Sequence, residues 1–170
     1  MVDYGGKGVS WGTTAIVSTS LRGHEVAATL QSQQHRVRFS DGVDDGSVIF
    51  PLSGIAFLLT TAQELIETSR AVVFERIQSF ISVHRNGFLV IEAALHESDE
   101  WDLMFGIQQR FLGSNLRILP AHNNGDIVKN MLIIAKATSK PHTEIIQDRI
   151  LKAKTQIVES SPVWEVLDQI

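Results

Sequence analysis

The chain has 170 residues, of which 44% are hydrophobic and 20% are charged, as is typical of a folded domain and not of a disordered chain. It contains no cysteine, which excludes disulfides, thiolate metal sites and cysteine nucleophiles. The net charge of −4 and the pI near 5.8 are unusual for a protein that binds nucleic acid by itself. Binding to DNA would therefore require a local basic patch or a basic partner.

The N-terminal part of the chain predicts strands and helices in alternation. The β-branched run Thr13–Thr19 is typical of a strand, and Gly23–Gln34 carries apolar residues at helical spacing. A short strand is expected around Val37 and Phe39. The segment Ser40–Gly46 is dense in turn-forming residues, which predicts an exposed hairpin or loop.

The next segment is apolar and interrupted. Ser47–Leu59 contains Pro51 and Gly54, which favour one bent strand or two short strands. A helix then follows whose expected apolar stripe comprises Val73, Ile77, Phe80 and His84.

The segment Phe88–Pro120 predicts a strand, a helix and a second strand. Phe88–Ile91 and Leu116–Leu119 are short candidates for buried strands. The helix between them starts with acidic residues and is expected to stop at Gly113, as the helix dipole and a left-handed C-cap favour. A βαβ unit of this length predicts parallel strands in a sheet that helices cover. The fold class is therefore α/β.

Residues 141–170 predict a separate helical arm. Asn123–Asp126 caps a helix that is expected to end before Pro141, which places a boundary there. We predict a flexible N-terminus over 1–12, a central domain over 13–140 and the arm over 141–170. Apolar residues of the arm recur at helical spacing, and Ser161-Pro162 starts a final short helix. The arm either packs on its own domain or docks a partner. The candidate partner-binding residues are Ile146, Ile150, Ile157, Val163, Trp164 and Leu167.

No convincing catalytic set is present in the sequence. Gly5-Gly6-Lys7-Gly8 resembles a phosphate loop, but it precedes the first strand and lacks the Gly-Lys-Ser/Thr ending. The six histidines lack metal-ligand spacing, and there is no Gly-x-Ser-x-Gly elbow. The start of the chain is not a signal peptide and no apolar run could span a bilayer, so we expect an intracellular protein with no membrane contact.

Acidic residues near predicted strand ends are the remaining catalytic candidates, because metal-dependent nucleases hold Mg²⁺ there with carboxylates. No lysine follows Glu92, as a Glu-x-Lys site requires, and Asp126 fits a helix N-terminus without any metal. We therefore expect no enzyme activity, no metal and no cofactor. The carboxylates considered are Asp41, Asp44, Asp45, Glu92 and Asp126.

Several phrases occur in the same order as in a known domain. These sequence segments are ERIQSF (Glu75–Phe80), FLVIEAAL, WDLMFGIQQRFLG and NLRILPAHN. Over Leu52–Pro141 the chain resembles the central domain of the ERCC-one protein, which is the catalytically silent partner of the XPF nuclease. In XPF-type nucleases the strand equivalent to Gly54–Leu59 carries Glu-Arg-Lys, whereas this chain reads Phe57-Leu58-Leu59-Thr60. The resemblance implies a restriction-nuclease-like, mostly parallel sheet flanked by helices, with the metal ligands replaced by apolar residues.

Longer phrases are more specific. SGIAFLL (Ser53–Leu59), QQRFLGSNLRILP (Gln108–Pro120), ATSKP and SPVW are similar to the vertebrate Spo-sixteen family of meiotic crossover proteins, over nearly the whole chain. The resemblance implies a non-catalytic subunit that pairs with a larger XPF-like meiotic protein (Zip-two in yeast, Shoc-one in mammals). The pair would bind branched recombination intermediates on meiotic chromosomes in the nucleus, without cutting them, and so favour crossovers and synapsis.

One departure from ERCC-one concerns the C-terminus. After Pro141 the chain has only a remnant of the tandem helix–hairpin–helix, so most of the DNA contact is expected to fall to the partner or to the assembled pair. Without its partner, the isolated chain is expected to self-associate, for example as a homodimer. Two alternatives stay open: an adaptor of the synapsis machinery with no DNA role, and an enzyme of unknown α/β type.

Two groups of cations form a weak candidate DNA footprint, because duplex binding requires cations that neutralise phosphates. Two arginines alternate on a short predicted strand, and four lysines lie towards the C-terminus. Ordinary charges on solvated faces are the commoner explanation for both groups. The residues are Arg36, Arg38, Lys136, Lys140, Lys152 and Lys154.

Overall fold

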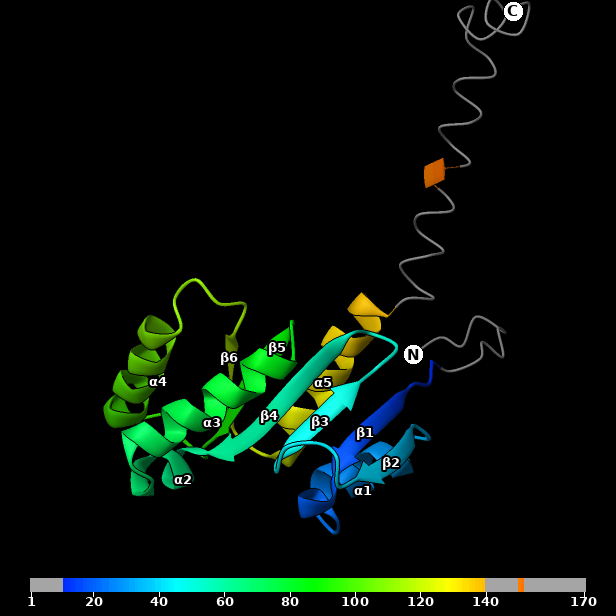
Figure 1. Ribbon diagram of the computed structural model, residues 1–170. Helices are drawn as coiled ribbons and strands as arrows, with labels where there is room; N and C mark the ends of the chain where they lie inside the picture. The colour runs from blue at the N-terminus through cyan, green and yellow to red at the C-terminus, as the bar shows by residue number, and fades with distance from the viewer. Residues whose placement is uncertain (1–10, 140–149, 152–170) are drawn as a thin grey trace, which may run out of the picture.

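Six strands form one mixed sheet, with helices on both of its faces (Figure 1). The computed structural model describes residues 11–139 and 150–151. The strands are β1 (Thr14–Ser18), β2 (Arg36–Ser40), β3 (Ser47–Phe50), β4 (Ile55–Thr61), β5 (Gly87–Glu92) and β6 (Arg117–Ala121). The helices are α1 (Glu25–Ser32), α2 (Ala62–Glu67), α3 (Arg70–Val83), α4 (Ser98–Arg110) and α5 (Asn124–Thr138), with a 3-10 turn at Thr19–Leu21.

The strand order is β2-β1-β3-β4-β5-β6. Strand β1 pairs with β2 in parallel, and β4, β5 and β6 form a second parallel group. Strand β3 lies between the two groups and is antiparallel to both of its neighbours. The sheet is therefore mostly parallel and flanked by helices, which confirms the predicted α/β class.

The predicted βαβ unit is confirmed as β5, α4 and β6. Strand β5 has five buried residues in a row, as a strand covered on both faces requires. Helix α4 starts with a capping box in which the side chains of Glu97 and Glu100 each accept a hydrogen bond from the other residue's backbone N–H. Gly113, with φ of +92°, lies in the turn that follows the helix. The cap and the turn fix the length of the helix between the two parallel strands.

Two cores lie on opposite faces of the sheet. The first combines Phe57 and Val90 with apolar residues of α1 and α5. The second combines Leu58 and Leu89 with apolar residues of α2, α3 and α4. Figure 1 shows α2, α3 and α4 gathered along the β4–β6 half of the sheet. Neighbouring residues of β4 and β5 thus alternate between two dry interiors.

Three local predictions differ from the structure. Helix α2 was not predicted, because only Ala62 and Leu65 of its six residues are buried and so short a segment shows no clear period. Of the two forms predicted for Ser40–Gly46, the loop is correct and the hairpin is not, because β2 and β3 are not neighbours in the sheet; the hairpin lies at Pro51–Gly54, between β3 and β4. His84 follows α3 as its C-cap and is not part of the helix.

The domain limits stay a prediction, although every strand and helix over 14–138 belongs to the expected central segment. Residues 1–10 and most of the predicted arm lie outside the described residues. In the described part, no helix has both the length and the apolar character needed to cross a membrane.

Buried His35 links the start of β1 to β2. The backbone N–H of Thr13 donates to Nδ1 of His35 at 3.1 Å, and Trp11 packs edge-on against the imidazole. Burial lowers the pKa of His35 below its usual value near 6.5. Protonation of Nδ1 would also remove the acceptor for Thr13.

We predict that the free energy of unfolding falls as the pH drops below about 6.5, the pKa of histidine in the unfolded chain. The folded-state pKa is lowered, so the unfolded chain binds the proton first and stability is retained only above that pH. Thermal melts between pH 7.5 and 5.5 measure this. In His35→Gln, whose amide oxygen can accept the Thr13 N–H, the pH-dependent loss should be smaller. An equal loss in both proteins would contradict the prediction.

Candidate functional site

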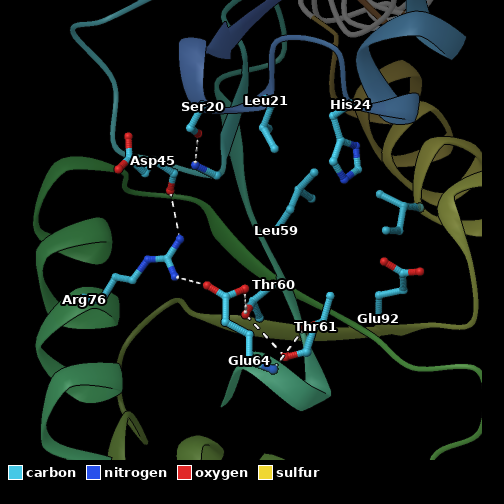
Figure 2. Close-up of a pocket in the computed structure, with 12 residues that line it drawn as sticks. Ser20, Leu21, His24, Asp45, Leu59, Thr60, Thr61, Glu64, Arg76 and Glu92 are labelled. Atoms are coloured by element: carbon cyan, nitrogen blue, oxygen red, sulfur yellow. Dashed lines mark hydrogen bonds and ion pairs between the residues drawn. The ribbon is translucent and has the colours of Figure 1, made fainter. Parts of the chain in front are cut away.

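A pocket of about 280 Å³ opens at the carboxyl ends of β4 and β5 (Figure 2). Strand β4 contributes Leu59, Thr60 and Thr61 to its lining, and Glu92 comes from the end of β5. The loops after β1 and β2 close the opposite side. In open α/β sheets this edge is where ligands usually bind, because strand ends and loops converge there.

Arg76 of α3 joins three segments at this pocket. Its Nη1 lies 3.1 Å from Oε1 of Glu64 on α2, and its Nη2 donates to the backbone oxygen of Asp45 at 3.0 Å (Figure 2). The hydroxyl of Thr60 donates to the other Glu64 oxygen at 3.2 Å. Both carboxylate oxygens of Glu64 are therefore engaged. Since Arg76 and Glu64 are both partly exposed, their ion pair stabilises the fold by only about 0.5 kcal/mol.

Gly46 allows the β2–β3 loop to approach this arrangement closely. Its φ is +77°, and a Cβ there would lie 3.0 Å from Nη2 of Arg76 and 3.0 Å from the backbone oxygen of Leu59. Its own N–H donates to the hydroxyl of Ser20 at 2.8 Å. A side chain at this position would be both strained and crowded, so glycine is required for the loop to contact α3.

The acidic residues considered as metal ligands are dispersed. Asp41 accepts a hydrogen bond from the Thr19 hydroxyl at 2.7 Å, and Asp126 accepts one from the backbone of His122 at 3.3 Å. Glu92 lines the pocket at the end of β5. Over residues 11–139 and 150–151, no group of three histidine, aspartate or glutamate side chains is placed to hold a metal ion.

Three histidines outside the described core illustrate what holds these side chains. His24 caps α1 by accepting the N–H of Val26 at 3.1 Å, and His96 lies 3.1 Å from the backbone oxygen of Ala121. Burial lowers the pKa of His84, and the negative charge of Asp44 opposes this effect. These three side chains belong to different parts of the fold.

Of the candidate DNA-binding residues, the structure describes Arg36, Arg38 and Lys136, and the arginines lie on the opposite face of the sheet from Lys136. Arg36 and Arg38 are exposed on edge strand β2, and their neighbours Val37 and Phe39 pack into the core beneath α1 and α5. Lys136 is exposed in the last turn of α5, which covers that same core. The arginine pair therefore faces away from Lys136. The other three candidates, Lys140, Lys152 and Lys154, lie outside the described residues.

The predicted partner-binding residues lie in the arm, of which the structure describes little. Ile150 is helical and half-exposed. Outside the described residues lie Ile146, Ile157, Val163, Trp164 and Leu167.

An exposed apolar stripe on α4 was missed by the sequence reasoning. Trp101 and Phe105 lie at spacing i and i+4 on α4 and are 53% and 64% exposed, and Leu112, in the turn after the helix, is 80% exposed; we call these three residues the α4 stripe. The indole N–H of Trp101 donates to the backbone of His96 at 3.1 Å. Because the His96 ring contacts the end of β6, the stripe begins beside that edge strand. Its helical spacing was readable, but only the packing of α4 shows that these residues face outward.

Comparisons with known proteins agree with this geometry. A family model described as "Protein SPO16 homolog" matches residues 9–170. The human protein of that description is 49% identical over 170 residues, which cover 100% of this chain and 94% of the human one.

Two solved structures of XPF from Aeropyrum pernix share the fold. The structure in complex with DNA aligns with a TM-score of 0.60 at 15% identity, covering 76% of this chain and 66% of that chain. The other structure, whose description mentions no DNA, aligns with a TM-score of 0.59 at 15% identity, covering 88% of this chain and 74% of that chain. At this identity the likeness establishes the fold alone. The chain therefore belongs to the SPO16 homolog family, and its described domain has the fold of the XPF nuclease, as the sequence resemblance predicted.

Proposed function

We propose that this protein is a non-catalytic subunit of a heterodimer with an XPF-like meiotic protein. The pair binds branched recombination intermediates on meiotic chromosomes in the nucleus and so promotes crossovers and synapsis. The observation that carries the proposal is a nuclease-type fold whose β4 positions Phe57–Leu59 are buried and apolar. Glu64, which Thr60 at the end of β4 contacts, is held by Arg76 and Thr60 instead of being open to a metal ion.

The α4 stripe supports a partner at the β6 edge. Large apolar side chains grouped on one helix face of a soluble protein mark an interaction site more often than chance. Trp101 and Phe105 are residue types that dominate interface energies when a partner buries them. In the absence of a partner the same stripe favours self-association of the isolated chain.

The charge distribution supports DNA contact through the pair. The net charge is −4, and the arginine pair Arg36 and Arg38 is separated from Lys136 by the sheet. The described candidate cations are therefore not gathered on one face, and in this proposal affinity depends largely on the partner's cations. The same separation favours the second candidate function, an adaptor of the synapsis machinery with no DNA role.

We expect Phe105→Glu to weaken pairing with the XPF-like partner by about tenfold or more, because it places a charge at the centre of the α4 stripe. Co-expression followed by pull-down and calorimetry measures this. Ile133→Glu is the matched control, since Ile133 is 58% exposed on α5, which covers the opposite face. Equal pairing by the two variants would argue against the α4 stripe. A chain truncated before Pro141 tests the arm, and intact pairing by it would remove the arm from the interface.

Branched-DNA binding over a salt series separates the two candidate functions. If this protein contacts DNA within the pair, Arg36→Ala/Arg38→Ala should reduce the slope of log affinity against log salt by roughly two units. Arg70→Ala/Arg85→Ala removes two exposed charges elsewhere and should leave the slope unchanged. Identical affinity and slope for the pair and for the partner alone would favour the adaptor.

We expect no Mg²⁺-dependent cleavage of branched DNA by the pair that depends on this subunit. Glu92→Ala and Asp126→Ala should leave any residual cleavage unchanged, because neither carboxylate belongs to a metal-ligand group in the described residues. A nuclease assay with labelled branched DNA measures this. Cleavage lost in either variant but kept in Glu75→Ala would show that the subunit is an enzyme.

A further inference from the structure

A second hollow lies beside the pocket at the end of β5. It has a volume of about 580 Å³ and is bounded by α2 on one side and by the β5–α4 connection on the other. We call it the α2–α4 groove; α2 and α4 border the same end of the sheet in Figure 1. Its volume is in the range that accommodates a small number of side chains.

The walls of the α2–α4 groove expose apolar side chains. Leu95 in the β5–α4 connection is 72% exposed, and Ile66 on α2 is 57% exposed. Both line the groove, together with alanines that form its base. Exposed apolar residues around a concave surface differ from scattered single ones, because one inserted side chain can contact them together.

The rim of the groove is negative. Its lining includes Glu67, Glu92, Glu97 and Glu100 and contains no lysine or arginine. Within the described chain, none of these four carboxylates takes part in a salt bridge. A concave, partly apolar wall concentrates the negative potential of such carboxylates.

Two other occupants fit this surface poorly. A DNA phosphate would be repelled by the four glutamates, which no nearby lining cation offsets. A metal ion would need converging ligands, and the described residues place no three acidic or histidine side chains for that purpose. Glu97 and Glu100 already bond the first turn of α4.

We infer that the α2–α4 groove docks a protein segment in which a large apolar side chain is flanked by lysine or arginine. The apolar side chain contacts Leu95 and Ile66, and the flanking cations pair with the glutamates of the rim. This contact lies beyond the proposed heterodimer, because it uses neither the α4 stripe nor the arm. In this inference, the ends of β4 and β5 carry a recognition surface for a basic segment.

A phage-displayed library of random 12-residue peptides, selected on the full chain, tests the inference. The expected result is enrichment of peptides with at least two basic residues around an aliphatic or aromatic one. Synthetic peptides from the enriched pool should bind more weakly as salt rises, because rim contacts are screened. Absence of such enrichment would overturn the inference.

The decisive comparison uses two matched double variants. Glu67→Lys/Leu95→Ser changes one charge and one exposed apolar residue in the groove, and should weaken peptide binding by about tenfold or more. Glu75→Lys/Ile133→Ser makes the same two changes at exposed positions on α3 and α5 and should leave binding within about twofold. Thermal melts check that both variants are folded.

Other outcomes are distinguishable. Equal peptide binding by both double variants would overturn the inference. The inference would also be overturned if the unaltered protein and the control variant bound a 12-nucleotide single strand and the groove variant did not, because the groove would then bind nucleic acid. The groove variant should still pair with the XPF-like partner, so failure of the heterodimer and failure of the groove are read separately.

Discussion

The structure depends on the burial of strand β4 on both faces. Six of its seven residues are buried, and the five apolar ones alternate between the two cores. Phe57 stacks on Phe88 with ring centroids 5.0 Å apart, while Leu58 packs beneath α2 and α3 on the other face. A carboxylate or lysine at these positions would lose its hydration with no partner on the strand to compensate. The same strand therefore cannot both complete a dry core and carry hydrated metal ligands, and in this chain its residues complete the core.

The consequence appears at the end of β4, where the buried strand meets solvent. Thr60 bonds Glu64, Glu64 bonds Arg76, and Arg76 bonds the backbone of Asp45. This chain of contacts connects β4, α2, α3 and the β2–β3 loop with one guanidinium. Its ion pair contributes little to stability because it is half-exposed, so its main effect is to fix the positions of these segments. An edge whose segments are fixed in this way is suited to recognition by shape and charge.

Long, strongly periodic elements were predictable from the sequence, and relations between distant segments were not. Strand β5 and helix α4 carry clear apolar periods and end signals, so the βαβ unit was predicted correctly. The position of β3 between β1 and β4 depends on pairing that no local pattern specifies. For the same reason Arg36 and Lys136 could not be assigned to opposite faces before the helix covering each face was known. The α2–α4 groove combines residues about thirty positions apart and contains no sequence motif.

The composition of β6 constrains how a partner can use this side of the sheet. An exposed edge strand usually offers unpaired backbone groups to a strand from another protein. In β6, Pro120 pairs with Ile91 but has no N–H to offer outward. A continuous backbone ladder with a partner strand is therefore interrupted at that position. Contacts beside β6 must rely on side chains, and the outward residues available there are those of the α4 stripe. The proline and the stripe together favour an interface made by side chains over strand addition, because the described residues beside this edge present large apolar groups to solvent.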